Sequence, residues 1–172
     1  ILMQPSLADI LTRTPPQIWA ILAVIVALGL MQLRARAVKE ANLMIMPMAM
    51  IGLSLYTVYS NFGFIGQTIG PWFAGFGIAF AVNAVLLKSP SNATFDQQTQ
   101  KFLVPGSAIP LLIMLAIFAT NYAMGVTRAI QPERLADSDV RIKACAILGL
   151  LSGLLFARAI RIGKAKKRAH AA

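Results

Sequence analysis

The sequence is poor in the residues from which most metal and redox sites are built. It contains one cysteine, Cys145, and one histidine, His170, among 172 residues. A single cysteine excludes an intramolecular disulfide, a CxxC redox pair and a thiolate zinc cluster. A single histidine excludes a bis-histidine haem and a multi-histidine metal site within one chain. We therefore expect no cofactor and no resident metal.

Charged residues are also scarce, and acidic ones most of all. Only 13% of the residues are charged, six of them Asp or Glu, whereas 58% are hydrophobic and the mean hydropathy is +0.69. Soluble domains carry about 25% charged residues, so this composition predicts an integral membrane protein. No acidic residue falls within a predicted membrane core. A proton-coupled carrier or a carboxylate-based membrane enzyme would need one there, so we expect a protein that is not an enzyme.

Long apolar stretches are what the sequence has in abundance. Each approaches the roughly 20 residues that a helix needs to cross a hydrocarbon core, and a segment in lipid must be helical to satisfy its backbone. They predict an all-α membrane protein, a single domain made of a bundle of five transmembrane helices, with spans at about 17–33, 42–60, 69–87, 107–127 and 140–160.

The basic residues predict the orientation of these spans. With five spans and the N-terminus outside, 11 of the 16 Lys and Arg residues face the cytoplasm, as the positive-inside rule requires. This clustering beside apolar runs is typical of charge sorting across a bilayer, and it argues against nucleic acid as a partner. A basic cytoplasmic tail, residues 161–172, is expected to contact anionic lipids through Arg161, Lys164, Lys166, Lys167 and Arg168.

The longest polar loop lies between the third and fourth spans, from Lys88 to Pro105. Its segment "ATFDQQTQKFLV" predicts a small cytoplasmic β-hairpin. Thr94 and Phe95 would form the first strand, Asp96 would begin the turn, and 102–104 would form the second strand.

Polar and aromatic residues gather in the predicted outer half of the bundle. Asn121 and Tyr122 interrupt the apolar fourth span, and Tyr56 and Tyr59 lie at the same depth in the second span. An amide at this depth needs a partner inside the bundle or in a watery cavity. One interpretation is an interhelical hydrogen bond to Tyr56 or Tyr59 worth about 1 kcal/mol. The other is an outward-facing cavity for a small molecule or a lipid head group.

The two tryptophans and four of the glycines have structural interpretations. Trp19 and Trp72 begin the first and third spans, where an aromatic belt at the outer surface is expected. Gly149 and Gly153 lie four residues apart inside the fifth span, a spacing typical of close helix packing, and we expect an internal contact there. Gly66 and Gly70 have the same spacing at the start of the third span.

Four methionines, Met44, Met46, Met48 and Met50, alternate along the second span. Thioethers are soft ligands for Cu(I), but residues two apart on a helix point to nearly opposite sides. The second interpretation is that they fill gaps and face lipid.

Several blocks resemble a known family: "RTPPQIWAIL", "QLRARAV", "PMAMIGLSLY", "FLVPGSAIPLLIMLAIFATNYAMGV" and "GLLSGLLFARAIRI". They look like an uncharacterised family of small bacterial integral membrane proteins, a domain of unknown function of the five-helix type. The resemblance covers nearly the whole chain and implies a protein of the bacterial inner membrane. The second span and its basic loop are also loosely similar to membrane proteins associated with cytochrome c maturation. That role is not carried over, because the chain has one cysteine and no haem-binding motif.

Two functions follow as expectations. The first is a small non-enzymatic accessory or scaffold subunit that packs against lipids and against another membrane protein or a second copy of the chain. The alternative is transport or binding of a small molecule or lipid through the outer-half cavity near Tyr56, Tyr59, Asn121 and Tyr122.

Overall fold

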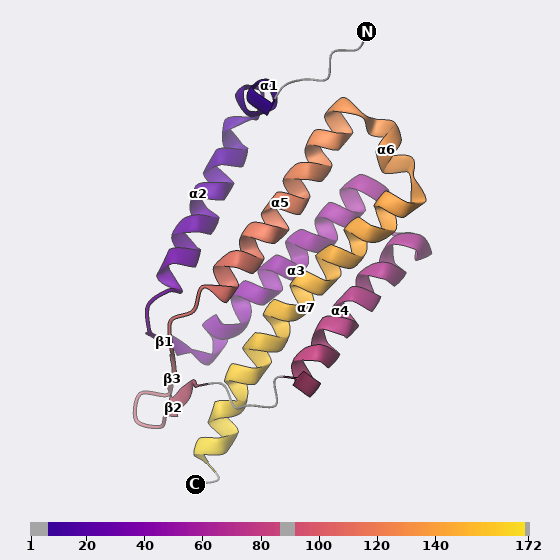
Figure 1. The fold of residues 1–172 in the computed structure, drawn as a ribbon. Helices are drawn as coiled ribbons and strands as arrows, with labels where there is room; N and C mark the ends of the chain where they lie inside the picture. The colour runs from indigo at the N-terminus through magenta and orange to yellow at the C-terminus, as the bar shows by residue number, and fades with distance from the viewer. Residues whose placement is uncertain (1–6, 87–91, 171–172) are drawn as a thin grey trace.

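The computed structural model describes residues 7–86 and 92–170, which are mostly helical. Long helices run alternately between the two ends of the bundle (Figure 1). These are α2 (Pro16–Met31), α3 (Glu40–Phe62), α4 (Gly66–Leu86), α5 (Ile109–Ile130) and α7 (Ser138–Ala169). The short helices α1 (Leu7–Thr12) and α6 (Pro132–Ala136) lie at one end, here called the α1 end, and a small sheet lies at the other, here called the sheet end. Each predicted span coincides with one long helix.

Three of these helices are long and apolar enough to cross a membrane by length and composition. They are Glu40–Phe62, Ile109–Ile130 and Ser138–Lys167. Helix α2, with 16 residues, is a shorter apolar helix. The fifth expected span, whose apolar part from Ala144 to Ala157 is short, lies in one of the three qualifying helices. These helices therefore support a membrane protein, and crossing by all five helices stays a prediction.

The sheet has three strands where the sequence predicted two. Strands β2 (Thr94–Asp96) and β3 (Lys101–Val104) form the predicted hairpin. The additional strand β1 (Arg36–Lys39) pairs antiparallel with β3, so the order is β1-β3-β2. Strand β1 was missed because four residues between two helices carry little strand signal, and its partner is distant in sequence. The sheet ties the α2–α3 connection to the chain segment that precedes α5.

The hairpin turn is organised by Asp96. Its carboxylate accepts hydrogen bonds from the Thr99 hydroxyl at 2.7 Å and from the backbone N–H of Gln98 at 2.9 Å. These bonds favour the charged form, and they lower the pKa of Asp96 below its ordinary value. Gln100, at the end of the turn, has a φ of 53°, in the left-handed region that tight turns often require.

Helix α7 continues past the predicted end of the fifth span near residue 160 and runs to Ala169. Its last turns are therefore not a separate tail in the described chain. Ile162 and Ala165 are buried against Phe95 and Phe102 of the sheet, and this apolar contact keeps the basic segment helical. Lys166 also pairs with Glu40 at 2.5 Å. Residues 171 and 172 of the predicted tail lie outside the described residues.

The most extensive contact between two helices in the described chain is that of α4 with α7. A Cβ atom added to Gly153 would lie 2.6 Å from the carbonyl oxygen of Phe76, and one added to Gly149 would collide with the carbonyl oxygen of Trp72. On the facing side, a Cβ at Gly75 would collide with the carbonyl oxygen of Ala146. Gly149 and Gly153 thus lie in an internal contact, because each gives room for the backbone of α4.

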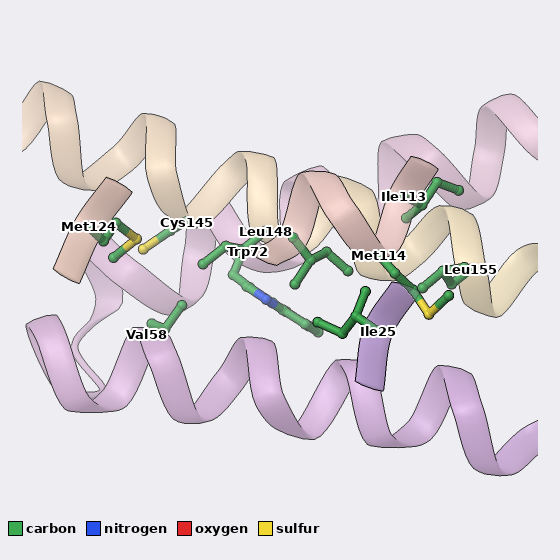
Figure 2. Close-up of a cluster of buried hydrophobic side chains, with 10 residues drawn as sticks. Ile25, Val58, Trp72, Ile113, Met114, Met124, Cys145, Leu148 and Leu155 are labelled. Carbon is green, nitrogen blue, oxygen red and sulfur yellow. The ribbon is translucent and has the colours of Figure 1, made fainter. Parts of the chain in front are cut away.

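Trp72 lies in the core rather than in an outer aromatic belt. Its side chain is 3% exposed, whereas that of Trp19 is 46% exposed. The indole runs through a cluster of buried side chains that includes Leu148 and Ile25 (Figure 2). Its Nε1 donates a hydrogen bond of 2.8 Å to Ser54 Oγ, which satisfies its polar atom. The expectation of a surface position was wrong because the glycines of α7 bring that helix over Trp72.

We expect Gly149→Ala to destabilise the protein by about 1–3 kcal/mol, because the added methyl group must push α7 away from the backbone of α4. Thermal unfolding in detergent, followed by circular dichroism, measures the effect. Gly70→Ala on α4 is the matched control, since nothing lies within 4 Å of the position of its Cβ and alanine is the better helix former. Equal stability of the two variants would contradict the close contact.

Candidate functional site

A cavity of about 670 Å³ lies at the α1 end of the bundle. Helix α1 and the turn after it, the first half of α2, the second half of α3 and the last three turns of α5 all contribute to its lining. Most of the lining is apolar, with Ile18, Ile21, Leu53 and Phe118 among its walls. The volume falls in the range of roughly 300–1,000 Å³ that is usual for small-molecule sites.

Asn121 of α5 lines this cavity, and its Oδ1 atom is buried without a hydrogen-bond partner. The anticipated hydrogen bond to Tyr56 or Tyr59 is not formed by this oxygen. A buried carbonyl oxygen without a partner costs about 1–3 kcal/mol. The unpaired oxygen is therefore a position where a ligand with an N–H or O–H group would find an acceptor.

Tyr122, the next residue of α5, closes one side of the cavity. Its hydroxyl lies 2.7 Å from Thr14 Oγ1, which in turn donates to the carbonyl oxygen of Ile10 at 2.8 Å. This chain of contacts joins α5 to the end of α1. The ring of Tyr122 stacks on Phe118 with 6.2 Å between centroids.

The two tyrosines of α3 have different surroundings. Tyr56 lines the cavity and is 66% exposed. Tyr59 is 58% exposed, lies outside the cavity lining and packs on Phe64 with 5.1 Å between ring centroids. Ile21 on α2 lines the cavity and is also exposed. The cavity is therefore open to the surface, since exposed residues of α2, of α3 and of the end of α5 all line it.

The attachments of α2 to the rest of the bundle explain where the cavity lies. Near the sheet end, a Cβ at Gly29 would collide with the side chain of Leu111 on α5, and the N–H of Ser107 donates to the carbonyl oxygen of Gln32 at 2.9 Å. At the α1 end, the Thr14–Tyr122 contact provides the attachment. Ile25 is buried in the core cluster, so the open space lies beside the first half of α2, between Ile25 and Thr14.

Sequence reasoning missed the part of the lining that precedes α2. Asp9, Arg13 and Thr14 give the cavity its polar end, and Thr57 of α3 adds a hydroxyl. The segment "SLADILTR" before Pro15 predicts only a short interfacial helix. Nothing in its pattern shows which helix it folds against.

The basic residues at the sheet end do not share one surface. Lys164 and Lys167 are exposed, whereas Lys166 is half-buried beside Glu40. Arg161 is half-buried as well. The side chain of Arg168 lies outside the described residues. Contact with anionic lipid stays a prediction for these five residues.

The methionines of α3 have different surroundings. Met48 is 55% exposed, Met50 packs against the core, and Met46 Sδ accepts a hydrogen bond of 2.9 Å from Gln32 Nε2. Within residues 7–86 and 92–170, no three His, Cys, Asp or Glu side chains gather as a metal site would need. Cys145 is buried in the core cluster.

Comparison with known proteins places the chain in one family. No curated protein and no solved structure matches it significantly. A family model described as "Family of unknown function (DUF6622)" matches residues 2–172, which is nearly the full length, as the sequence blocks indicated. This chain therefore belongs to that family of unknown function, DUF6622.

Proposed function

We propose that the protein is a multi-pass membrane protein that binds an amphiphilic small molecule, a lipid or a lipid-like compound, in the cavity at the α1 end. The observation that carries this proposal is the buried, unpaired Oδ1 of Asn121 in a cavity of about 670 Å³ with mostly apolar walls. A ligand that donates a hydrogen bond to this oxygen would remove its desolvation penalty. The apolar walls suit the hydrocarbon part of the same ligand.

The exposed residues of the lining support a ligand that comes from the bilayer. Ile21 of α2 and Tyr56 of α3 line the cavity with exposed side chains, which would face lipid in the topology proposed below. A molecule dissolved in lipid could enter there without crossing water. Asp9 and Arg13 at the α1 end would lie near the polar part of such a ligand.

The proposal includes the topology. Five spans, with the N-terminus outside and the C-terminus in the cytoplasm of a bacterium, would put the cavity in the outer half of the plasma membrane. The distribution of basic residues supports this orientation, since 11 of 16 would lie on the inner side. The alternating directions of the five long helices are compatible with it (Figure 1).

The orientation can be tested with single cysteines in a Cys145→Ala background. Glu133→Cys at the α1 end and Gln98→Cys in the hairpin turn both place the thiol at an exposed position. In intact spheroplasts, we expect a membrane-impermeant maleimide to label the first variant, and the second only after permeabilisation. If both variants were labelled from the outside, the chain between the two positions could not cross the membrane an odd number of times. The reverse labelling pattern would show the opposite orientation.

The cavity is tested by Asn121→Leu. We expect about tenfold weaker binding of a dansyl-labelled fatty-acid amide, whose N–H can donate to Oδ1, which corresponds to the roughly 1.4 kcal/mol of one hydrogen bond. Thermal stability without ligand should not fall, because the substitution removes an unpaired buried acceptor. Fluorescence titration in detergent measures the affinity.

Asn61→Leu is the matched control for this experiment. Asn61 lies at the same end of the bundle, but its amide donates to the carbonyl oxygen of Thr57 in its own helix, and it does not line the cavity. Its affinity for the probe should equal that of the wild type. Unchanged binding by Asn121→Leu would show that the amide is dispensable, and would sink the cavity proposal.

A second candidate function is the accessory or scaffold subunit, and one feature of α4 favours it. A Cβ atom added at Gly66, Gly70 or Gly77 would have nothing within 4 Å, although Gly75 on the opposite side touches α7. This open stripe could receive a helix of a second membrane protein or of a second copy, as small residues do in membrane helix pairs.

Native mass spectrometry of the protein, extracted gently from its own membrane, tests the accessory role. We expect a second polypeptide to remain bound to the wild type and to be lost from Gly70→Leu and Gly77→Leu, which fill the open stripe. Gly52→Leu on α3, also with open space around it, should retain the partner. A chain found without any bound polypeptide would remove the accessory role.

A further inference from the structure

A second, smaller pocket lies at the sheet end, between α3, α7 and the connection that leads into α5. Its volume is about 50 Å³, more than the roughly 10–15 Å³ that a cavity needs to hold one water molecule. The polar residues that line it are Gln32, Arg36, Asn42 and Arg158. Apolar side chains that include Leu43 and Leu155 complete it. This pocket is separate from the cavity at the α1 end.

The charge in this pocket has one sign. Arg158 is half-buried on α7, and the positive charges of Arg36 and Arg161 lie near enough to repel it. No acidic residue lines the pocket. Glu40 begins the helix that forms one wall, but it pairs with Lys166 at 2.5 Å. A cation withdrawn from water without a counter-charge is unfavourable, so the pocket is suited to an anion.

The buried amide of Gln32 is a second observation, independent of the charges, that indicates a ligand. Gln32 is 8% exposed and lines the pocket. Its Nε2 donates to the sulfur of Met46 at 2.9 Å, and a thioether is a weak acceptor. A stronger acceptor in the pocket would therefore gain a hydrogen bond from an amide that is already in place.

We propose that this pocket binds a phosphate group, with Arg36 and Arg158 as its charged ligands and Gln32 as an amide donor. The planar guanidinium group forms paired hydrogen bonds to phosphate oxygens, and basic pockets between membrane helices on the cytoplasmic side are places where lipid head groups bind. The phosphate belongs either to the head group of an anionic phospholipid or to a free phosphate ion. The site is distinct from the exposed lysines of the last turns of α7.

The experiment uses the full chain in detergent and follows its thermal midpoint. Inorganic phosphate, phosphatidylglycerol and dioleoylglycerol, which lacks phosphate, are added separately. A ligand that binds only the native state stabilises it by RT ln(1 + L/Kd), where L is the free ligand concentration, so the midpoint rises with that concentration. We expect at least one of the two phosphate compounds to raise it and dioleoylglycerol not to. Arg36→Gln with Arg158→Gln should weaken the apparent affinity at least tenfold.

The same double variant should unfold no earlier than the wild type when no ligand is present, since it removes charges that repel each other. A purely structural role for the arginines would lower the ligand-free midpoint instead. Lys164→Gln with Lys167→Gln is the matched control, because both lysines are exposed on the same helix and the change in net charge is equal. This control should keep the wild-type response.

The outcomes separate the two phosphate sources. A response to phosphatidylglycerol alone identifies a head group, and a response to inorganic phosphate identifies the free ion. If the lysine control lost as much apparent affinity as the arginine variant, the ligand would be held by diffuse attraction to the basic helix, and the proposed phosphate site would be overturned. The absence of any rise in the wild-type midpoint would also overturn it. If the double variant does not fold, the single variant Arg36→Gln, at an exposed position on strand β1, should still weaken binding about threefold. Wild-type affinity in that single variant would overturn the proposal.

Discussion

The contact between the backbones of α4 and α7 is the constraint on which the rest of the bundle depends. Apolar side chains gain little by leaving lipid for the protein interior, so membrane helices associate where small residues let their backbones approach. Gly75, Gly149 and Gly153 provide that approach here. It brings α7 over Trp72, which then reaches Ser54 on α3. One glycine-lined contact thus fixes three helices and centres the core on an indole ring (Figure 2).

Helix α2 joins this central unit through Ile25 in its second half, and its first half borders the cavity. It packs against α5 at Gly29 and is attached again through Thr14 at the α1 end. Between Thr14 and Ile25, the first half of α2 borders a space that side chains do not fill. Asn121 faces this space with an acceptor that the protein does not satisfy. In a bundle selected for stability alone, that amide would be paired or replaced. The cavity is therefore the part of the fold where a side chain lowers stability, as is expected of functional sites.

The sequence predicts what depends on local pattern and misses what depends on contacts between distant segments. Apolar runs located the helices and turn residues located the hairpin, because both signals lie within one segment. The pairing of β1 with β3 joins residues on either side of two helices, and no local pattern records it. Trp72 looked like a surface anchor because its neighbour α7 lies far along the chain. Asn121 stood out as an amide within an apolar span. That it shares a cavity with Thr14 and Asp9 depends on how α1 folds back.

The two polar sites are complementary in chemistry and separated by packed side chains. The α1 end offers an acceptor without a donor, and the sheet end offers cations and an amide without a strong acceptor. Between them, Met114, Ile117 and Leu148 are fully buried, and the cavity and the smaller pocket share no lining residue. A molecule in one site has no polar route to the other through this apolar layer, since a polar group would have to be desolvated there. The two proposed ligands would therefore occupy separate ends of the bundle.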